Sequence, residues 1–200
     1  MGTPFLINKN METPFSLDPL LKRYGSRRAR LEPVYEDMFE ESQALATPRY
    51  LQKTFPAGEL PVMSADLPGA ETITLGLCTL GPALESRVSE LFQEEPVSAV
   101  VLDEIGTHWV LKLGDKMYRD IRSAARTTGK QTSPSYRPGI GRWPLELQGE
   151  LLTHLTASKI GVRLIGDMLE PQKSISMIVA VGAKLRRKHR RPAAVGKSTQ

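Results

Sequence analysis

Cysteine is almost absent from this 200-residue sequence, which contains only Cys78. A single cysteine excludes an intrachain disulfide and a metal site built from cysteines alone. The three histidines have no second histidine or cysteine at the spacing of metal ligands, so we expect surface or structural roles for His108, His154 and His189. No Walker loop, nucleophile elbow or dinucleotide fingerprint is present. The sequence therefore carries no self-contained catalytic or metal-binding motif.

Long apolar runs are also missing. No stretch approaches the roughly 20 apolar residues that cross a bilayer. The N-terminus has neither the basic start nor the apolar stretch of a signal peptide. We therefore expect a soluble, cytoplasmic protein without a membrane partner. A hydrophobic content of 40% over 200 residues is enough for one domain with a sizeable core.

The positive charge is concentrated at the C-terminus. The formal net charge is +5, from 27 Lys/Arg and 22 Asp/Glu. Seven basic residues and no acidic residue lie in 184–200, so the rest of the chain carries −2. We interpret 1–13 as a flexible N-terminal arm, 14–183 as the folded domain and 184–200 as a flexible basic tail. The tail is either a solvating segment or an arm for RNA or an anionic surface; a nucleic-acid-binding fold is not expected.

Hydrophobic periodicity predicts a mixture of helices and strands. The helical segments are 20–24, 31–46, 83–93, 96–126 and the segment that starts at Pro144. The strands are 50–55, a short one near 59–62, 71–80, 160–165 and 174–182, with the last two paired as a β-hairpin around the turn 170–173. This order does not repeat as βαβ units. It favours an α+β fold in which a twisted, mainly antiparallel sheet is packed with helices.

The stretch from Ser133 to Pro144 is the most unusual in composition. Its twelve residues include two glycines, three prolines, two aromatics and two arginines. Glycines at 139 and 141 permit positive φ and close approach of a ligand. Pro144 fits the first position of the helix that follows. The stretch is either a structural turn before a core-packed helix, or a loop whose free N–H groups bind a polar or anionic ligand.

A family resemblance is centred on this stretch. The run reads Pro138-Gly139-Ile140-Gly141-Arg142-Trp143-Pro144-Leu145-Glu146. It resembles the signature of the activation domain of cobalamin-dependent methionine synthase and its stand-alone relatives, R-x-x-P-G-Y-x-x-x-P, often continued as P-G-Y-G-D-W-P-L-E. The resemblance extends, more weakly, from about Leu20 to Gly182, and it implies that family's α+β fold. Ser135 stands where the family has arginine, and Ile140 where it has tyrosine.

The resemblance also implies a site for S-adenosylmethionine. Its residues here are Asp103, Ser135, Tyr136, Arg137, Gly139, Ile140 and Gly141. Arg137 suits the cofactor carboxylate as a bidentate partner, and Tyr136 either stacks on the adenine or fills a core gap. Asp103 matches an acidic position at the start of the family's long helix. From the residues alone, the pair Asp103-Glu104 interrupts an apolar run, so either a buried carboxylate needs a partner or ligand, or both face solvent.

Two functions follow from the resemblance. In the first, the protein binds S-adenosylmethionine and assists reductive methylation of a corrinoid held by a partner methyltransferase or corrinoid protein. The cobalamin and the electron come from outside, because the chain has no D-x-H-x-x-G corrinoid motif and no flavin or iron–sulfur motif. The protein then contributes proximity and orientation rather than a catalytic residue. In the alternative, it is a non-catalytic module of the same fold that docks such a methyltransferase.

Overall fold

A computed structural model describes residues 5–7 and 16–185 of the chain. Its centre is a five-stranded sheet in the order β1-β2-β3-β7-β4, with every neighbouring pair antiparallel. The strands are β1 (Phe5–Ile7), β2 (Arg49–Pro56), β3 (Thr72–Thr79), β7 (Ser174–Gly182) and β4 (Gln131–Thr132). A separate two-stranded hairpin is formed by β5 (Arg163–Ile165) and β6 (Met168–Glu170).

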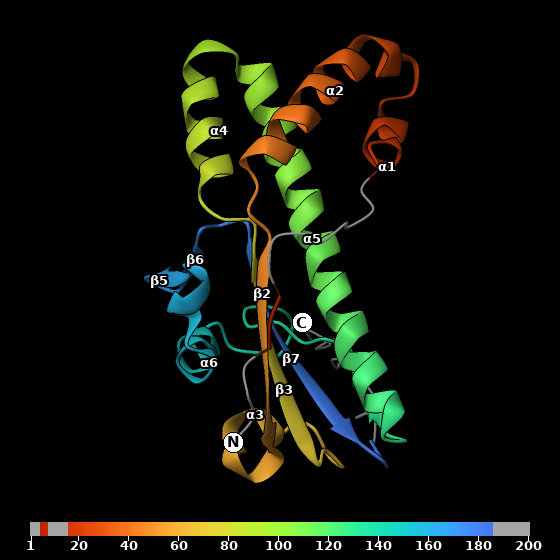
Figure 1. Ribbon diagram of the computed structural model, residues 1–200, viewed down its shortest axis with the longest axis vertical. Helices are drawn as coiled ribbons and strands as arrows, with labels where there is room; N and C mark the ends of the chain where they lie inside the picture. Colours follow the sequence, from red (N-terminus) through yellow and green to blue (C-terminus); the bar gives the residue numbers. More distant parts are fainter. Residues whose placement is uncertain (1–4, 8–15, 186–200) are drawn as a thin grey trace, which may run out of the picture.

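Helices cover both faces of the sheet and form a lobe beyond one end of it (Figure 1). The α-helices are α1 (Asp18–Leu21), α2 (Arg28–Leu45), α3 (Pro61–Ser64), α4 (Ala83–Glu94), α5 (Pro96–Thr127) and α6 (Leu147–Leu155). Short 3-10 helices are η1 (Lys22–Arg27), η2 (Ala57–Glu59) and η3 (Ala157–Ile160). The predicted α+β class, with a mainly antiparallel sheet packed with helices, is confirmed.

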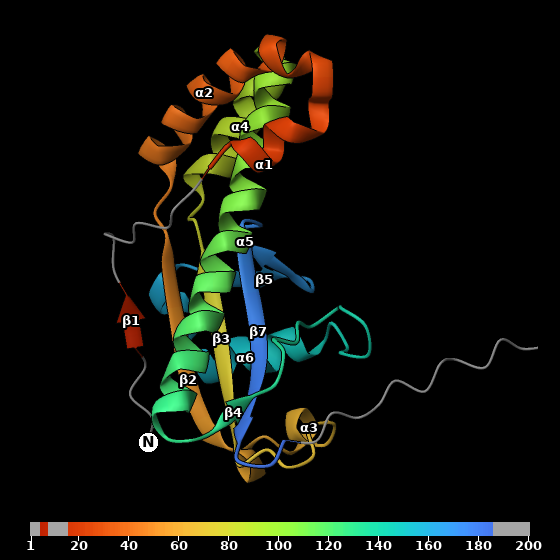
Figure 2. The same ribbon diagram turned by 90° about the vertical axis from the view of Figure 1, so that its right-hand side faces the viewer.

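Strand β7 separates the two main cores. All nine of its residues are buried. Because side chains alternate along a strand, Ile178 and Ala180 join the core on the α6 side, whereas Met177 and Val179 join the core on the α5 side. Figure 1 shows α5 and α6 on opposite sides of the strands, and in Figure 2 α5 lies in front of the strands and α6 behind them. A strand that is apolar on both faces belongs in the middle of a sheet.

The third core lies in the helical lobe. Leu20, Leu21, Tyr35, Val101 and Ile105 form it, from α1, α2 and the N-terminal half of α5. Helix α5 has 32 residues, and its predicted apolar stripe is buried from Ile105 to Ile121, so it contributes to this core and to the sheet core. The prediction fails at the start of the helix, where Val97 and Val100 are 60% and 54% exposed. One continuous helix therefore joins the lobe to the sheet.

The structure corrects several predicted elements. The strand near 160–165 pairs with β6 rather than with β7, because a tight turn at Gly166, with φ +58°, closes a local hairpin. Strand β7 instead pairs with β3 along its length. The predicted strand at 59–62 is helical, since Pro61 occupies a helix N-terminus.

The helix predicted to begin at Pro144 begins at Leu147, after a turn in which the Leu147 N–H lies 3.4 Å from the Pro144 carbonyl oxygen. Within the described residues, no helix combines the length and the apolar character needed to span a membrane. Of the predicted N-terminal arm, the structure describes only Phe5–Ile7, which form β1, and the predicted basic tail lies outside the described residues apart from 184–185.

Candidate functional site

The central stretch continues the sheet beyond β4. The Ser133 N–H donates to the Ala180 carbonyl at 2.9 Å, and the Ser133 Oγ accepts from the Ala180 N–H at 3.0 Å. Tyr136 and Ile178 then exchange two backbone hydrogen bonds of 2.9 and 2.8 Å. Residues 133–136 are thus held against β7, and the residues that follow start from a fixed position.

After Tyr136 the chain turns back on itself. The Gly139 N–H donates to the Trp143 carbonyl at 2.8 Å, and the Ile140 N–H donates to the Arg137 carbonyl at 3.1 Å. Gly139 has φ +80°, and a Cβ placed there would lie 3.0 Å from Leu145 Cδ1, so only glycine fits this turn without strain. These N–H groups close the turn and are not offered to a ligand.

Aromatic packing anchors the turn in the core. Trp143 is buried, and its ring stacks on that of Tyr136 with centroids 5.0 Å apart and planes inclined by 30°. Tyr136 also packs against the core on the α6 side. This is the arrangement expected if Tyr136 fills a core gap.

A cavity of about 220 Å³ lies beside the turn, hereafter the loop cavity. It is open to solvent and is lined by the turn, the start of α6, strand β6 and the start of β7. Its polar lining comes from Arg137, Gln148, Gln172, Ser174 and Ser176. Its apolar lining comes from Pro138, Ile140, Leu145, Met168, Leu169 and Ile175. The two residue classes make it suited to a small ligand with one polar end.

Most of these polar side chains are already hydrogen-bonded. The Ser176 hydroxyl donates to Gln148 Oε1 at 2.7 Å, and Gln148 Nε2 donates to the Asp167 carbonyl at 3.2 Å. The Ser174 hydroxyl donates to Thr79 Oγ1 at 2.8 Å. This network fixes the wall formed by α6 and β7.

Arg137 differs from these residues. It is half-buried, and among the described residues its guanidinium has no hydrogen bond or ion pair. Burial raises the pKa of the Cys78 thiol to about 12, and the charge of Arg137 acts in the opposite direction, so the guanidinium lies within electrostatic reach of β3. A half-buried cation without a counter-charge favours an anionic ligand group.

Asp103 lies next to the loop cavity rather than on its wall. Lys173 Nζ donates to Asp103 Oδ1 at 2.7 Å and to Thr107 Oγ1 at 2.9 Å. The Lys173 stem crosses α5 at Gly106, where a Cβ would lie 3.3 Å from Lys173 Cε. Lys173 directly precedes Ser174, which lines the loop cavity. The ion pair with Asp103 therefore fixes the position of the chain just before β7 begins.

The neighbouring carboxylate has a different environment. Glu104 is the more buried member of the pair, with a side chain 16% exposed against 50% for Asp103. It accepts hydrogen bonds from Tyr35 and Tyr24 and pairs with Arg23. Of the two carboxylates, the one that is mostly removed from solvent is therefore Glu104, and its partners belong to the helical lobe.

The remaining predicted site residues lie apart. Ser135 lines a separate groove on the α5 side of the central stretch, and Gly141 is exposed in the turn. The structure thus brings together Arg137, Gly139 and Ile140. It also reveals Gln148 and Ser176, which sequence reasoning missed. Their signal was present, because Gln148 occupies a position on the apolar stripe of its helix and Ser176 interrupts the apolar run of β7.

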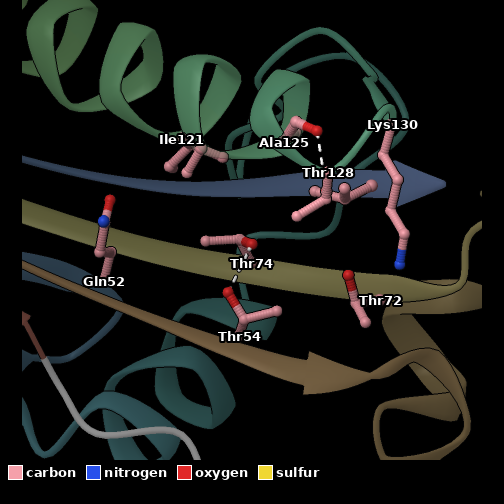
Figure 3. A pocket seen from close by; sticks show the side chains of 10 residues that line it. Gln52, Thr54, Thr72, Thr74, Ile121, Ala125, Thr128 and Lys130 are labelled. Atoms are coloured by element: carbon pink, nitrogen blue, oxygen red, sulfur yellow. Dashed lines mark hydrogen bonds between the residues drawn. The ribbon is translucent and has the colours of Figure 1, made fainter.

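A further cavity, of about 270 Å³, lies between the C-terminal end of α5 and strands β2 and β3 (Figure 3). Thr54 and Thr74 share a hydrogen bond of 2.9 Å there, and Lys130 lies at its end. Within the described part of the chain, Gln52 Oε1 is buried without a hydrogen-bond partner. No predicted site residue lines this cavity, and the described residues form no cluster of three or more potential metal ligands.

Comparisons with known proteins bear on the fold. No family model matches the sequence, and no curated protein matches it. Among solved structures, the chain is similar to the MetH reactivation domain, in its crystal structure bound to AdoHcy, with a TM-score of 0.65 and 10% sequence identity. The match covers 89% of this chain and 78% of that chain. At this identity the likeness shows a shared fold, in agreement with the α+β class predicted from the sequence.

Proposed function

We propose that this protein binds S-adenosylmethionine at the loop cavity and assists the reductive methylation, and hence the reactivation, of a corrinoid held by a partner protein. The observation that carries the proposal is the half-buried Arg137, which has no counter-charge among the described residues and lines the cavity. The fold that it shares with the MetH reactivation domain, a protein bound to AdoHcy in its crystal structure, supports the choice of ligand.

The residues of the loop cavity fit one end of this cofactor. The Arg137 guanidinium suits the amino-acid carboxylate, with which it forms charge-assisted hydrogen bonds. The volume, about 220 Å³, is below the roughly 300–1,000 Å³ of most small-molecule pockets. The cavity therefore takes the amino-acid end, and the apolar side chains of Ile140 and Met168 at the rim, 59% and 62% exposed, are available to the adenosine.

In this function the chain contributes position rather than chemistry. The bound cofactor supplies an electrophilic methyl group to a reduced corrinoid. Arg137 orients the donor, while Gln148 and Ser176 keep the opposite wall in place through their mutual hydrogen bond. Fixing two reactants in one geometry removes much of the entropic barrier. The corrinoid comes from a partner methyltransferase or corrinoid protein, and the electron comes from an external donor.

The alternative function is a non-catalytic module that docks a corrinoid-dependent methyltransferase and does not bind the cofactor. A specific observation favours it. Ile140, Ile165 and Met168 are 59%, 57% and 62% exposed, and two of them line the loop cavity. Exposed apolar side chains that cluster on one surface are typical of protein-binding sites.

Calorimetric titration with S-adenosylmethionine and with AdoHcy separates the two functions. The wild type is expected to bind saturably, and Arg137→Ala to bind at least tenfold more weakly, which is about 1.4 kcal/mol. Arg30→Ala is the matched control, because Arg30 is an exposed arginine in the distant α2. Absence of wild-type binding at millimolar cofactor would overturn the first function. Ile140→Asp and Met168→Asp would then be expected to abolish binding to a corrinoid protein if the alternative holds.

A further inference from the structure

A groove larger than both cavities described above lies on the α5 side of the central stretch. It has a volume of about 590 Å³ and separates the C-terminal half of α5 from residues 130–135. The Tyr118 hydroxyl donates to the Ser133 carbonyl at 2.8 Å, so the two walls are tied together at one point. Hereafter it is the α5 groove.

Positive charge is concentrated around the α5 groove. Residues 112–130 include six Lys/Arg and two Asp/Glu, although the chain without its basic tail carries −2. Arg122, Arg126 and Lys130 line the groove, with a single carboxylate, Asp115. The other acidic residue of this segment, Asp120, is already paired with Lys116 at 2.9 Å.

The two arginines lack partners. Lys130 pairs with Glu71 at 2.9 Å, but within the described residues the exposed side chains of Arg122 and Arg126 make no ion pair or hydrogen bond. Four residues apart on one helix, they project from the same face. Arg126 lies in the last turn of α5, where the helix dipole favours a cation. That effect fades within one turn, so it does not account for Arg122.

We propose that the α5 groove binds a phosphate or pyrophosphate group. Two adjacent guanidinium groups match the oxygens of such an anion bidentately. The Thr132 and Ser135 side chains on the opposite wall supply hydroxyl donors. S-adenosylmethionine carries a net positive charge, from its sulfonium and ammonium groups against one carboxylate, and two unpaired arginines disfavour it. The α5 groove is therefore a site distinct from the loop cavity and does not depend on the function proposed above.

The test is calorimetric titration of the full chain with inorganic pyrophosphate, and in parallel with AMP. The wild type is expected to bind saturably. The Arg122→Gln/Arg126→Gln double variant is expected to bind at least tenfold more weakly, about 1.4 kcal/mol. Tighter binding of AMP than of pyrophosphate identifies a phosphate ester as the ligand, and the reverse identifies a free inorganic anion.

The matched control is Arg30→Gln/Arg119→Gln, which removes the same charge from two exposed positions outside the groove. It is expected to bind within twofold of the wild type. All variants retain 184–200, so any binding by the basic tail cancels in the comparison. Lack of saturable binding by the wild type would overturn the proposal, and so would equal weakening in the two double variants, because that result indicates attraction by net charge alone. Neither result bears on S-adenosylmethionine binding at the loop cavity.

Discussion

Replacing Asp103 with alanine is expected to destabilise the protein, because the change removes the carboxylate that pairs with the ammonium group of Lys173. Lys173 is 8% exposed, and its Nζ lies 2.7 Å from Asp103 Oδ1 and 2.9 Å from Thr107 Oγ1. After the substitution, the Thr107 hydroxyl is the one remaining hydrogen-bond partner among the described residues. The Glu85 carboxylate, which accepts the Lys173 backbone N–H, still interacts with the Lys173 charge and offsets part of the desolvation penalty of the buried ammonium group.

The size of the effect follows from the exposure of the pair. Removing one partner of a fully buried ion pair costs about 3–5 kcal/mol, whereas exposed pairs contribute up to about 1 kcal/mol. Here the Asp103 side chain is 50% exposed and the Lys173 side chain 10% exposed. Water therefore screens the pair from one side. We expect a loss of about 1–2 kcal/mol in the free energy of unfolding, between the two limits.

Urea denaturation followed by tryptophan fluorescence measures this loss. The control is Asp115→Ala, an exposed aspartate of the same helix whose side chain has no ion pair or hydrogen bond among the described residues. It experiences the same gain in helix propensity. In a Lys173→Met background, Asp103→Ala should hardly change the free energy of unfolding, because that background has no buried ammonium group that could lose its partner. Equal losses for the two aspartates, or an undiminished loss in the Lys173→Met background, would refute the reasoning.

Two further predictions concern buried titratable groups. Cys78 is fully buried and burial raises its pKa to about 12, so iodoacetamide should modify it only on unfolding; labelling of the native protein as fast as a free thiol would contradict this. Burial raises the pKa of Glu85, which accepts the Lys173 N–H at 2.7 Å. A carboxyl group with a higher pKa in the folded state than in the unfolded state stabilises the fold at pH values below its unfolded pKa. This contribution to stability is lost as the pH rises through the folded-state pKa. Glu85→Gln keeps the acceptor, so its stability relative to wild type should increase over that pH range in urea denaturation; a pH-independent difference would rule this out.

Local patterns predicted much of the fold. From Ile105 to Ile121 the apolar stripe of α5 is buried as expected, because a helix that packs on one side repeats its contacts every three or four residues. The alternation in 71–80 likewise identified β3. Pairing was the weak point, since the partner of a strand is set by packing far along the chain. Strand β7 was assigned to the nearest strand in sequence, yet its partner is β3, about 100 residues earlier.

The site was less predictable than the fold. Periodicity placed Asp103 and Glu104 on one helix but did not indicate which would be buried, because this depends on how α2 and α1 pack on α5. The ion pair between Asp103 and Lys173 joins residues 70 positions apart. The unpaired state of Arg137 is also a property of the whole fold, since it depends on which carboxylates other segments bring near. The basic residues of 112–130 were likewise not evident from the net charge of the whole chain, because the basic residues of 184–200 account for its positive sign.

The position of β7 has a consequence for protein synthesis. This strand, the last one in the described residues, lies between β3 and β4, so β3 has no partner on that side until residues 174–182 have left the ribosome. Before then, the apolar edge of β3 lacks its partner and both cores lack a shared wall. The helical hairpin formed by α4 and α5 is built from contacts between neighbouring segments, so its formation requires no later part of the chain. We therefore expect the helical lobe to form on the nascent chain and the sheet to close only after β7 emerges, which leaves β3 as the segment most in need of chaperone protection during translation.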